Sequence, residues 1–208
     1  MPTRSSTEIW QYWQRIRGLN AAPMRRDVDP GAIRAILPDV FILEHGADGA
    51  TRFRLAGTRI CAAFGRELRG TRLADLWTAS ARDAIQQELA AVMIREAPAA
   101  AEVSGRTGSG QAVTVEVTVL PMRSSGPGSD RILGTLCVHP AAQWLGNDPL
   151  ASLAGSLLHG RPAAIAASPE PVNAQTSTVV VGVTSTTQGT RRARPFLLKI
   201  LDGGRRPT

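Results

Sequence analysis

The chain has 208 residues, of which 43% are hydrophobic and 20% charged, and its formal net charge is +7. This length suits one domain with appended segments, and the apolar content is enough for a packed core. The first 17 residues lack the apolar stretch of a secretory signal, and nowhere do 18 apolar residues follow one another, which excludes a spanning helix. With only Cys61 and Cys137, a cytoplasmic protein with reduced thiols is expected.

An amphipathic helix is predicted over Ser5–Leu19. Ser5 and Glu8 have the spacing of a capping box. Apolar residues recur at helical spacing and need cover from water: Ile9, Trp10, Trp13 and Ile16. Two arrangements would provide that cover. Either the helix docks on the domain's own sheet, or it pairs with the same helix of a second subunit in a homodimer, because aromatic anchors favour interfaces.

A second helix is predicted to begin at Asp29 and Pro30, with the aspartate as N-cap, and to end by Leu37. Val40–Glu44 and a strand beginning at Thr51 then form a hairpin around a glycine-containing turn.

Within the second strand, Phe53 and Leu55 alternate with arginines, so both side chains are expected to face the core. After Gly57, three apolar residues spaced three and four apart predict a short helix: Ile60, Ala63 and Phe64.

Ser80–Glu96 is the clearest helix, with one apolar face formed by Ile85, Leu89, Val92 and Met93. Three strands follow, at Ala99–Arg106, Val113–Val119 and Ile132–His139. The order of two strands, helices and three strands predicts an α+β fold with a five-stranded antiparallel sheet and helices on one face.

From Pro140 the composition shifts to Ala, Ser, Pro, Thr and Gly, which predicts a disordered low-complexity linker in which Leu150–Leu158 forms at most a transient helix. The chain is therefore divided into residues 1–29 (flanking helix and loop), 30–139 (folded domain) and 140–208 (linker and basic tail).

Residues 140–208 carry seven basic and three acidic side chains, which is +4 of the total +7. The tail includes the cluster Arg191–Arg194. Basic arms of this kind often bind partners, so the alternative function is a nucleic-acid-associated regulator that uses this tail, with salt-dependent binding.

Three sequence blocks occur in a fixed order: WQYW at 10–13, ILPDVFILE at 36–44, and FRLAG at 53–57 followed by GRELRG at 65–70. Their order resembles PAS-type sensor domains, and is most similar to a bacterial branch long catalogued as a domain of unknown function. The resemblance covers residues 8–140. It implies a PAS fold and a regulatory role exerted through protein contacts.

The chain departs from the family pattern at Gly57 and Thr58, where many PAS domains carry an asparagine. A flavin-reactive cysteine motif is also absent, which leaves the cofactor unknown. In PAS domains a cavity lies between the sheet and the helices after the second strand. The resemblance therefore implies that an apolar or anionic small molecule is lined by Phe53, Leu55, Phe64, Leu68, Leu73, Trp77, Val117 and Val119, unless these residues simply fill the core.

No catalytic constellation is recognised, so the chain is not expected to be an enzyme. The glycine-rich Gly105–Gly110 lacks the Lys-Ser/Thr ending of a phosphate-binding loop. The histidines at 45, 139 and 159 are too scattered for a metal site, and His139 is expected at a strand rim. Glu67, between two glycines, either faces a ligand or pairs with a nearby arginine at the surface.

Overall fold

The computed structural model describes residues 3–139 and 147–159. The elements, in chain order, are α1 (Arg4–Arg17), β1 (Val40–His45), β2 (Thr51–Ala56), α2 (Thr58–Ala63), α3 (Arg82–Arg95), β3 (Ala99–Thr107), β4 (Ala112–Met122), β5 (Arg131–His139), β6 (Leu150–Ala154) and β7 (Leu158–His159). Short 3-10 turns lie at Arg25–Asp27, Pro30–Ile33, Leu37–Asp39, Leu73–Leu76 and Ala79–Ala81. No helix within this part of the chain is long and apolar enough to cross a membrane.

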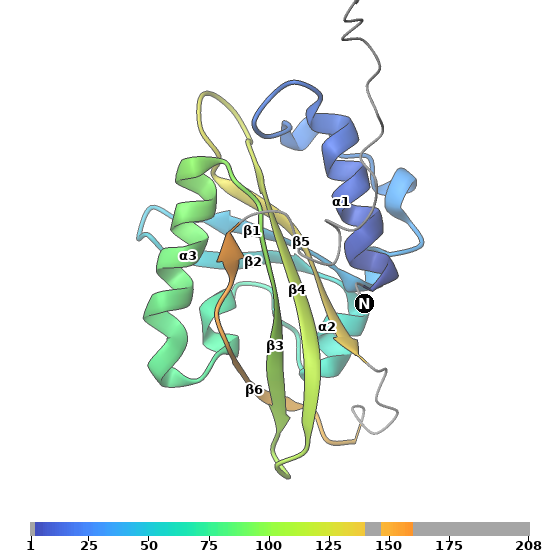
Figure 1. Ribbon diagram of the computed structural model, residues 1–208, viewed down its shortest axis with the longest axis vertical. Helices are drawn as coiled ribbons and strands as arrows, with labels where there is room; N and C mark the ends of the chain where they lie inside the picture. Colours follow the sequence, from blue (N-terminus) through green and yellow to red (C-terminus); the bar gives the residue numbers. More distant parts are fainter. Residues whose placement is uncertain (1–2, 140–146, 160–208) are drawn as a thin grey trace, which may run out of the picture. The chain divides into compact units, whose positions relative to one another are not determined.

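The strands form one antiparallel sheet in the order β2-β1-β5-β4-β3-β6, and β7 also pairs with β3. The five predicted strands are β1 to β5, so the expected α+β fold with an antiparallel sheet is confirmed. In Figure 1, α3 lies on one side of the sheet and α1 on the other. The expectation of helices on one face thus holds for α2 and α3, while α1 covers the opposite face.

The inner core lies between the sheet and the α2/α3 side, and it buries the predicted apolar face of α3. At its centre, Gly134 of β5 faces the ring of Phe41. A Cβ atom at position 134 would lie 2.4 Å from Phe41 Cζ and 2.2 Å from the backbone oxygen of Thr118. The sheet and the Phe41 ring therefore approach each other more closely than any side chain at this position would allow.

The outer core lies between α1 and the opposite face of the sheet. Thr3 caps α1 by accepting the N–H of Ser6, so the helix begins one residue before the predicted start. Ser5 is inside the first turn, where its buried hydroxyl donates to Asp39 at 2.6 Å. Further along, the indole N–H of Trp13 donates to the backbone oxygen of Pro121 at 2.8 Å, which ties the helix to β4.

The predicted second helix is only a 3-10 turn, although its cap is as expected. Asp29 accepts the N–H of Gly31 at 2.8 Å, and Pro30 is the first helical residue. Fewer than ten residues separate Pro30 from Pro38, and Gly31 weakens the first turn. A helix this short is marginal, and a proline disfavours helical backbone at the residue before it.

One stretch of chain, Gly70–Thr78, covers both margins of the sheet. Along β2, the N–H of Phe53 donates to the oxygen of Thr71 at 2.9 Å. At the other margin, the N–H of Thr78 donates to the oxygen of Leu153 in β6 at 3.0 Å. The hydrogen-bonding edges of the curled sheet are thus met by other parts of the same chain.

The transient helix predicted at Leu150–Leu158 is wrong, because these residues include all of β6 and the first residue of β7. Leu150, Leu153 and Leu157 are buried in the inner core. Their spacing of three and four resembles a helical face, but a register shift in β6 and the positive φ of Gly155 bring all three to the same side of an extended segment. The basic tail falls within residues 160–208, outside the described part of the chain.

Glu96 ends α3 with left-handed backbone (φ 48°), which is uncommon for a residue other than glycine. Its half-buried carboxylate accepts hydrogen bonds from the guanidinium of Arg123, with Nε at 2.6 Å, and from the hydroxyl of Ser129 at 2.9 Å. The Arg123 hydrogen bonds hold the pKa of Glu96 below its usual value. The ion pair therefore fixes the end of α3 to the loop between β4 and β5.

Replacing Glu96 with Gln is expected to reduce the free energy of unfolding by about 1–3 kcal/mol near neutral pH, because it leaves Arg123 without its charged partner. A carboxylate whose pKa is lower in the folded state stabilises the folded protein. This contribution is fully present above the unfolded-state pKa of about 4.3, and it is lost as the pH falls through the folded-state pKa. Urea unfolding across this pH range should show the difference between wild type and Glu96→Gln shrinking with falling pH.

The matched control is Glu102→Gln, at an exposed position of β3 with no ion pair among the described residues. Its free energy of unfolding should equal that of the wild type at every pH. A constant difference between wild type and Glu96→Gln across the range would show that the charge of Glu96 is not the cause.

Candidate functional site

Seven of the eight residues predicted to line a ligand cavity are buried together in the inner core: Phe53, Phe64, Leu68, Leu73, Trp77, Val117 and Val119. The ring of Phe53 packs edge-on against Phe41, with 5.7 Å between centroids. The indole N–H of Trp77 donates to the backbone oxygen of Gly155 at 2.8 Å. The structure thus brings these residues to one place, where they contact one another as core side chains. Their role as a ligand lining stays a prediction.

Leu55 does not join them, because its side chain is 45% exposed. A register shift lies opposite Ile42 and Leu43, which pair with Leu55 and Phe53 respectively, so Arg54 is the extra residue of a β-bulge. A bulge breaks the alternation of a strand by one residue. The expectation that Leu55 faces the core is therefore wrong, and only Phe53 does.

The four predicted interface residues of α1 pack within the chain. Ile9, Trp10 and Trp13 are buried in the outer core, and Ile16 packs against it. The two tryptophan rings stack with centroids 5.9 Å apart. Of the two arrangements open from sequence, the structure has the helix docked on its own sheet. Homodimer formation through these four residues remains a prediction that would require α1 to leave this position.

Glu67 forms no ion pair with an arginine among the described residues, and its role as a ligand-facing carboxylate stays a prediction. Its Oε1 accepts the backbone N–H groups of Leu68 and Arg69, both at 3.0 Å, and these bonds lower the pKa of its carboxyl. His139 lies exposed at the end of β5. Across residues 3–139 and 147–159, no three His, Cys, Asp or Glu side chains are grouped closely enough to hold a metal ion.

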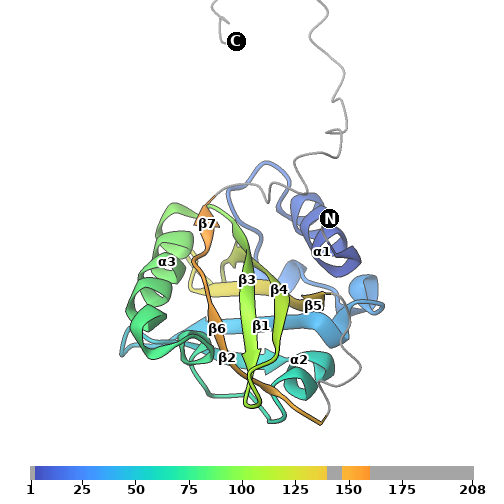
Figure 2. The ribbon, with the colours of Figure 1, turned by 60° about the horizontal axis from the view of Figure 1, so that its bottom comes forward.

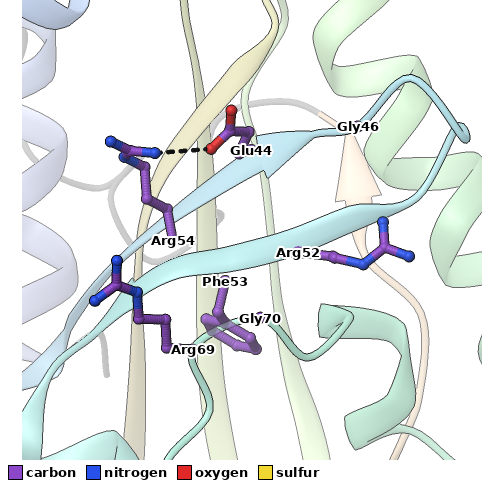
Figure 3. A pocket seen from close by; sticks show the side chains of 7 residues that line it. All are labelled: Glu44, Gly46, Arg52, Phe53, Arg54, Arg69 and Gly70. Carbon is purple, nitrogen blue, oxygen red and sulfur yellow. Dashed lines mark hydrogen bonds and ion pairs between the residues drawn. The ribbon is translucent and has the colours of Figure 1, made fainter.

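A hollow of about 280 Å³ opens at the surface beside the β1–β2 hairpin. We call it the arginine hollow; it is lined by Glu44, Gly46, Arg52, Phe53, Arg54, Arg69 and Gly70. Two strands and the loop after α2 build it, and Gly70, with φ 82°, lets that loop turn and donate its N–H to Phe53 at 2.7 Å. Figure 3 shows Arg54 and Arg69 extending to the same side of the hollow, while Arg52 extends toward the other end.

Positive charge exceeds negative charge among the residues that line the hollow. Glu44 is shared by Arg54 at 3.1 Å and Arg131 at 2.6 Å, and the hydrogen bond from Arg131 is the main cause of its lowered pKa. Arg52 pairs with Asp48 at 2.6 Å. Arg69 has no ion-pair partner among the described residues.

Guanidinium groups suit carboxylate and phosphate groups because their N–H donors form a planar fork. The three arginines of the lining therefore favour the binding of an anionic group. Sequence reasoning missed this site because Arg69 arrives from another loop, so no single element contains the lining. The only signal in the sequence was the arginine-rich alternation of β2 next to the GRELRG turn.

A family model described as a PAS domain matches residues 1–137, a range that ends two residues before the end of β5. No curated protein sequence matches the chain. The matched range includes α1, the arginine hollow and the helices over the inner core. It ends before β6 and β7.

Proposed function

Because the chain belongs to the PAS domain family, whose members are generally sensory and regulatory modules, we propose that it is a cytoplasmic regulatory protein that acts by contacting a partner protein. The arginine hollow is the observation that supports this proposal most directly. It is open to solvent and is lined by charged residues of the β1–β2 hairpin and of the loop after α2. The residues predicted to line a cavity instead pack against one another in the inner core.

The group recognised at the hollow is an anionic side chain of the partner. Arg54 and Arg69 both extend exposed guanidinium groups from one side of the hollow (Figure 3). Phe53 at its base is almost fully buried, so its ring is not available to a partner, and the specific contacts that the hollow offers are those of its guanidinium groups. This favours a carboxylate presented by a protein surface over an apolar ligand enclosed by side chains.

The double variant Arg54→Gln/Arg69→Gln is expected to weaken partner binding by about tenfold or more, because each charge-assisted hydrogen bond contributes about 1.5–3 kcal/mol. Partners captured by crosslinking to the wild type would be titrated against both proteins at two salt concentrations. Binding to the wild type should weaken at high salt.

Arg106→Gln, at an exposed position of β3 far from the hairpin in the sheet, is the control that removes a positive charge outside the hollow, and it should bind like the wild type. If the double variant binds a captured partner as tightly as the control does, the hollow is not the contact. If neither a partner nor a small molecule binds the folded domain, the regulatory proposal itself fails.

A further inference from the structure

Residues 147–159, which we call the strap, fill a groove between β3 and the helical side of the domain. On one side β6 pairs with Ser104–Thr107 and β7 with Ala99–Ala100. Figure 2 shows β6 and β7 running alongside β3. On the other side of the groove, the chain around Trp77 and Thr78 and the first half of α3 offer further partners to the strap.

Three hydrogen bonds hold the strap on that second side. Thr78 N–H donates to the oxygen of Leu153 at 3.0 Å, and the Trp77 indole donates to the oxygen of Gly155 at 2.8 Å. The N–H of Leu157 donates to the carboxylate of Glu88 at 2.7 Å. The groove therefore recognises mainly the backbone of an extended segment, which is how strand-binding sites gain affinity.

The groove accepts apolar side chains of the segment that it binds. Leu150, Leu153 and Leu157 insert into the inner core, each almost fully buried. Gly105 of β3 makes the space for the first of them, since a Cβ there would lie 2.9 Å from Leu150 Cδ2. The groove thus fits an extended segment with leucine-sized residues at its first, fourth and eighth positions.

The groove and its occupant belong to different parts of the chain. Ala99–Thr107, Trp77–Thr78 and Glu88 all lie within the range matched by the PAS family model, whereas the strap begins after that range ends at 137. The strap is therefore a peptide ligand tethered to the domain that binds it. Tethering through a short connection supplies an effective concentration on the order of millimolar.

Pairing between strap and β3 is interrupted. β6 and β7 cover the two ends of β3, while Ala101–Val103 have no strand partner in the strap. At this interruption Gly155 takes a φ of 127°, and a Cβ there would lie 3.1 Å from Val103 Cγ1. The strap is thus attached as two short pieces, whereas β4 and β5 pair continuously over nine residue pairs.

We propose that this groove is a strand-binding site, that the strap occupies it as an intramolecular competitor, and that an extended leucine-bearing segment of a partner protein displaces the strap. The groove is separate from the arginine hollow, so failure of this proposal leaves the one above unaffected. Displacement would uncover Trp77 and the backbone of Ser104–Thr107 in β3.

Hydrogen exchange on the full wild-type chain tests whether the strap leaves the folded domain. The N–H of Thr78 donates to the strap, and the N–H of Leu157 donates from the strap to Glu88, so release of the strap breaks both hydrogen bonds. Both amides should therefore exchange about tenfold or more faster than the amides of the β4–β5 ladder. Exchange of these two amides at the rate of the ladder would mean that the strap is released only by global unfolding, and would overturn the proposal.

A labelled synthetic peptide of residues 147–159 tests the site itself. It should bind the full-length Leu157→Ala variant, whose own strap is weakened, about tenfold or more tighter than it binds the wild type. The same peptide carrying Leu153→Asp is the control and should bind neither protein. Equal binding of the two peptides, or no binding of the first peptide to the variant, would count against a strand-binding groove.

Discussion

Gly134→Ala is expected to abolish folding or to remove at least about 3 kcal/mol of unfolding free energy. Overpacked cores typically lose about 1–3 kcal/mol when neighbours can move aside. Here the new methyl group would lie 2.2 Å from the backbone oxygen of Thr118 and 2.4 Å from the ring of Phe41, in the middle of the β1–β5–β4 sheet. The neighbouring strand cannot shift without breaking its ladder. Circular dichroism and urea unfolding would measure the loss.

Gly108→Ala is the matched control for this substitution. The nearest atom to a Cβ at position 108 is a carboxylate oxygen of Asp148, at the ordinary contact distance of 3.9 Å. Its unfolding free energy should stay within about 0.5 kcal/mol of the wild type, as for most surface substitutions. A Gly134→Ala protein that unfolds at the same urea concentration as this control would contradict the packing of Phe41 against β5.

Leu153→Ala is expected to lower the free energy of unfolding by about 2–5 kcal/mol, whereas Leu55→Ala should lower it by less than about 1 kcal/mol. Both substitutions remove the same atoms from a strand leucine. Leu153 is fully buried in the inner core, and Leu55 is 45% exposed beyond the bulge in β2. Thermal and urea unfolding of the two variants side by side would measure the difference.

The two leucine variants distinguish the burial seen in the structure from the burial predicted by sequence alone. Alternation in β2 predicts that Leu55 is the buried residue, and the composition after Pro140 predicts that Leu153 is not. Losses of equal size, or a larger loss for Leu55→Ala, would mean that β2 has no bulge or that the strap is not part of the folded domain.

Local patterns predicted most of the secondary structure because they report on burial along one element. The strand β4, the apolar face of α3 and the β1–β2 hairpin were all predicted from sequence, and all are present. The aromatic face of α1 was also identified, with the domain's own sheet and a second subunit left as alternative partners. Periodicity shows that a face is buried, but not which surface buries it.

The features that sequence could not predict depend on contacts between distant residues. The strap takes its strand conformation from β3 and Trp77, although its own leucine spacing resembles a helix. The bulge at Arg54 shows no local signal, yet it decides which side chain of β2 turns outward. The arginine hollow needs Arg69 to come from a different loop, so no window of sequence contains it.

The covered margins of the sheet have a consequence for the behaviour of the protein at high concentration. Exposed strand edges template edge-to-edge aggregation. Here the edge of β2 is hydrogen-bonded to Thr71, and the edge of β3 is paired with the strap. Lifting the strap would leave the backbone of Ser104–Thr107 available to other molecules. Solubility of this chain should therefore depend on the strap, and variants that weaken it should form precipitates or amyloid-like assemblies sooner than the wild type on concentration.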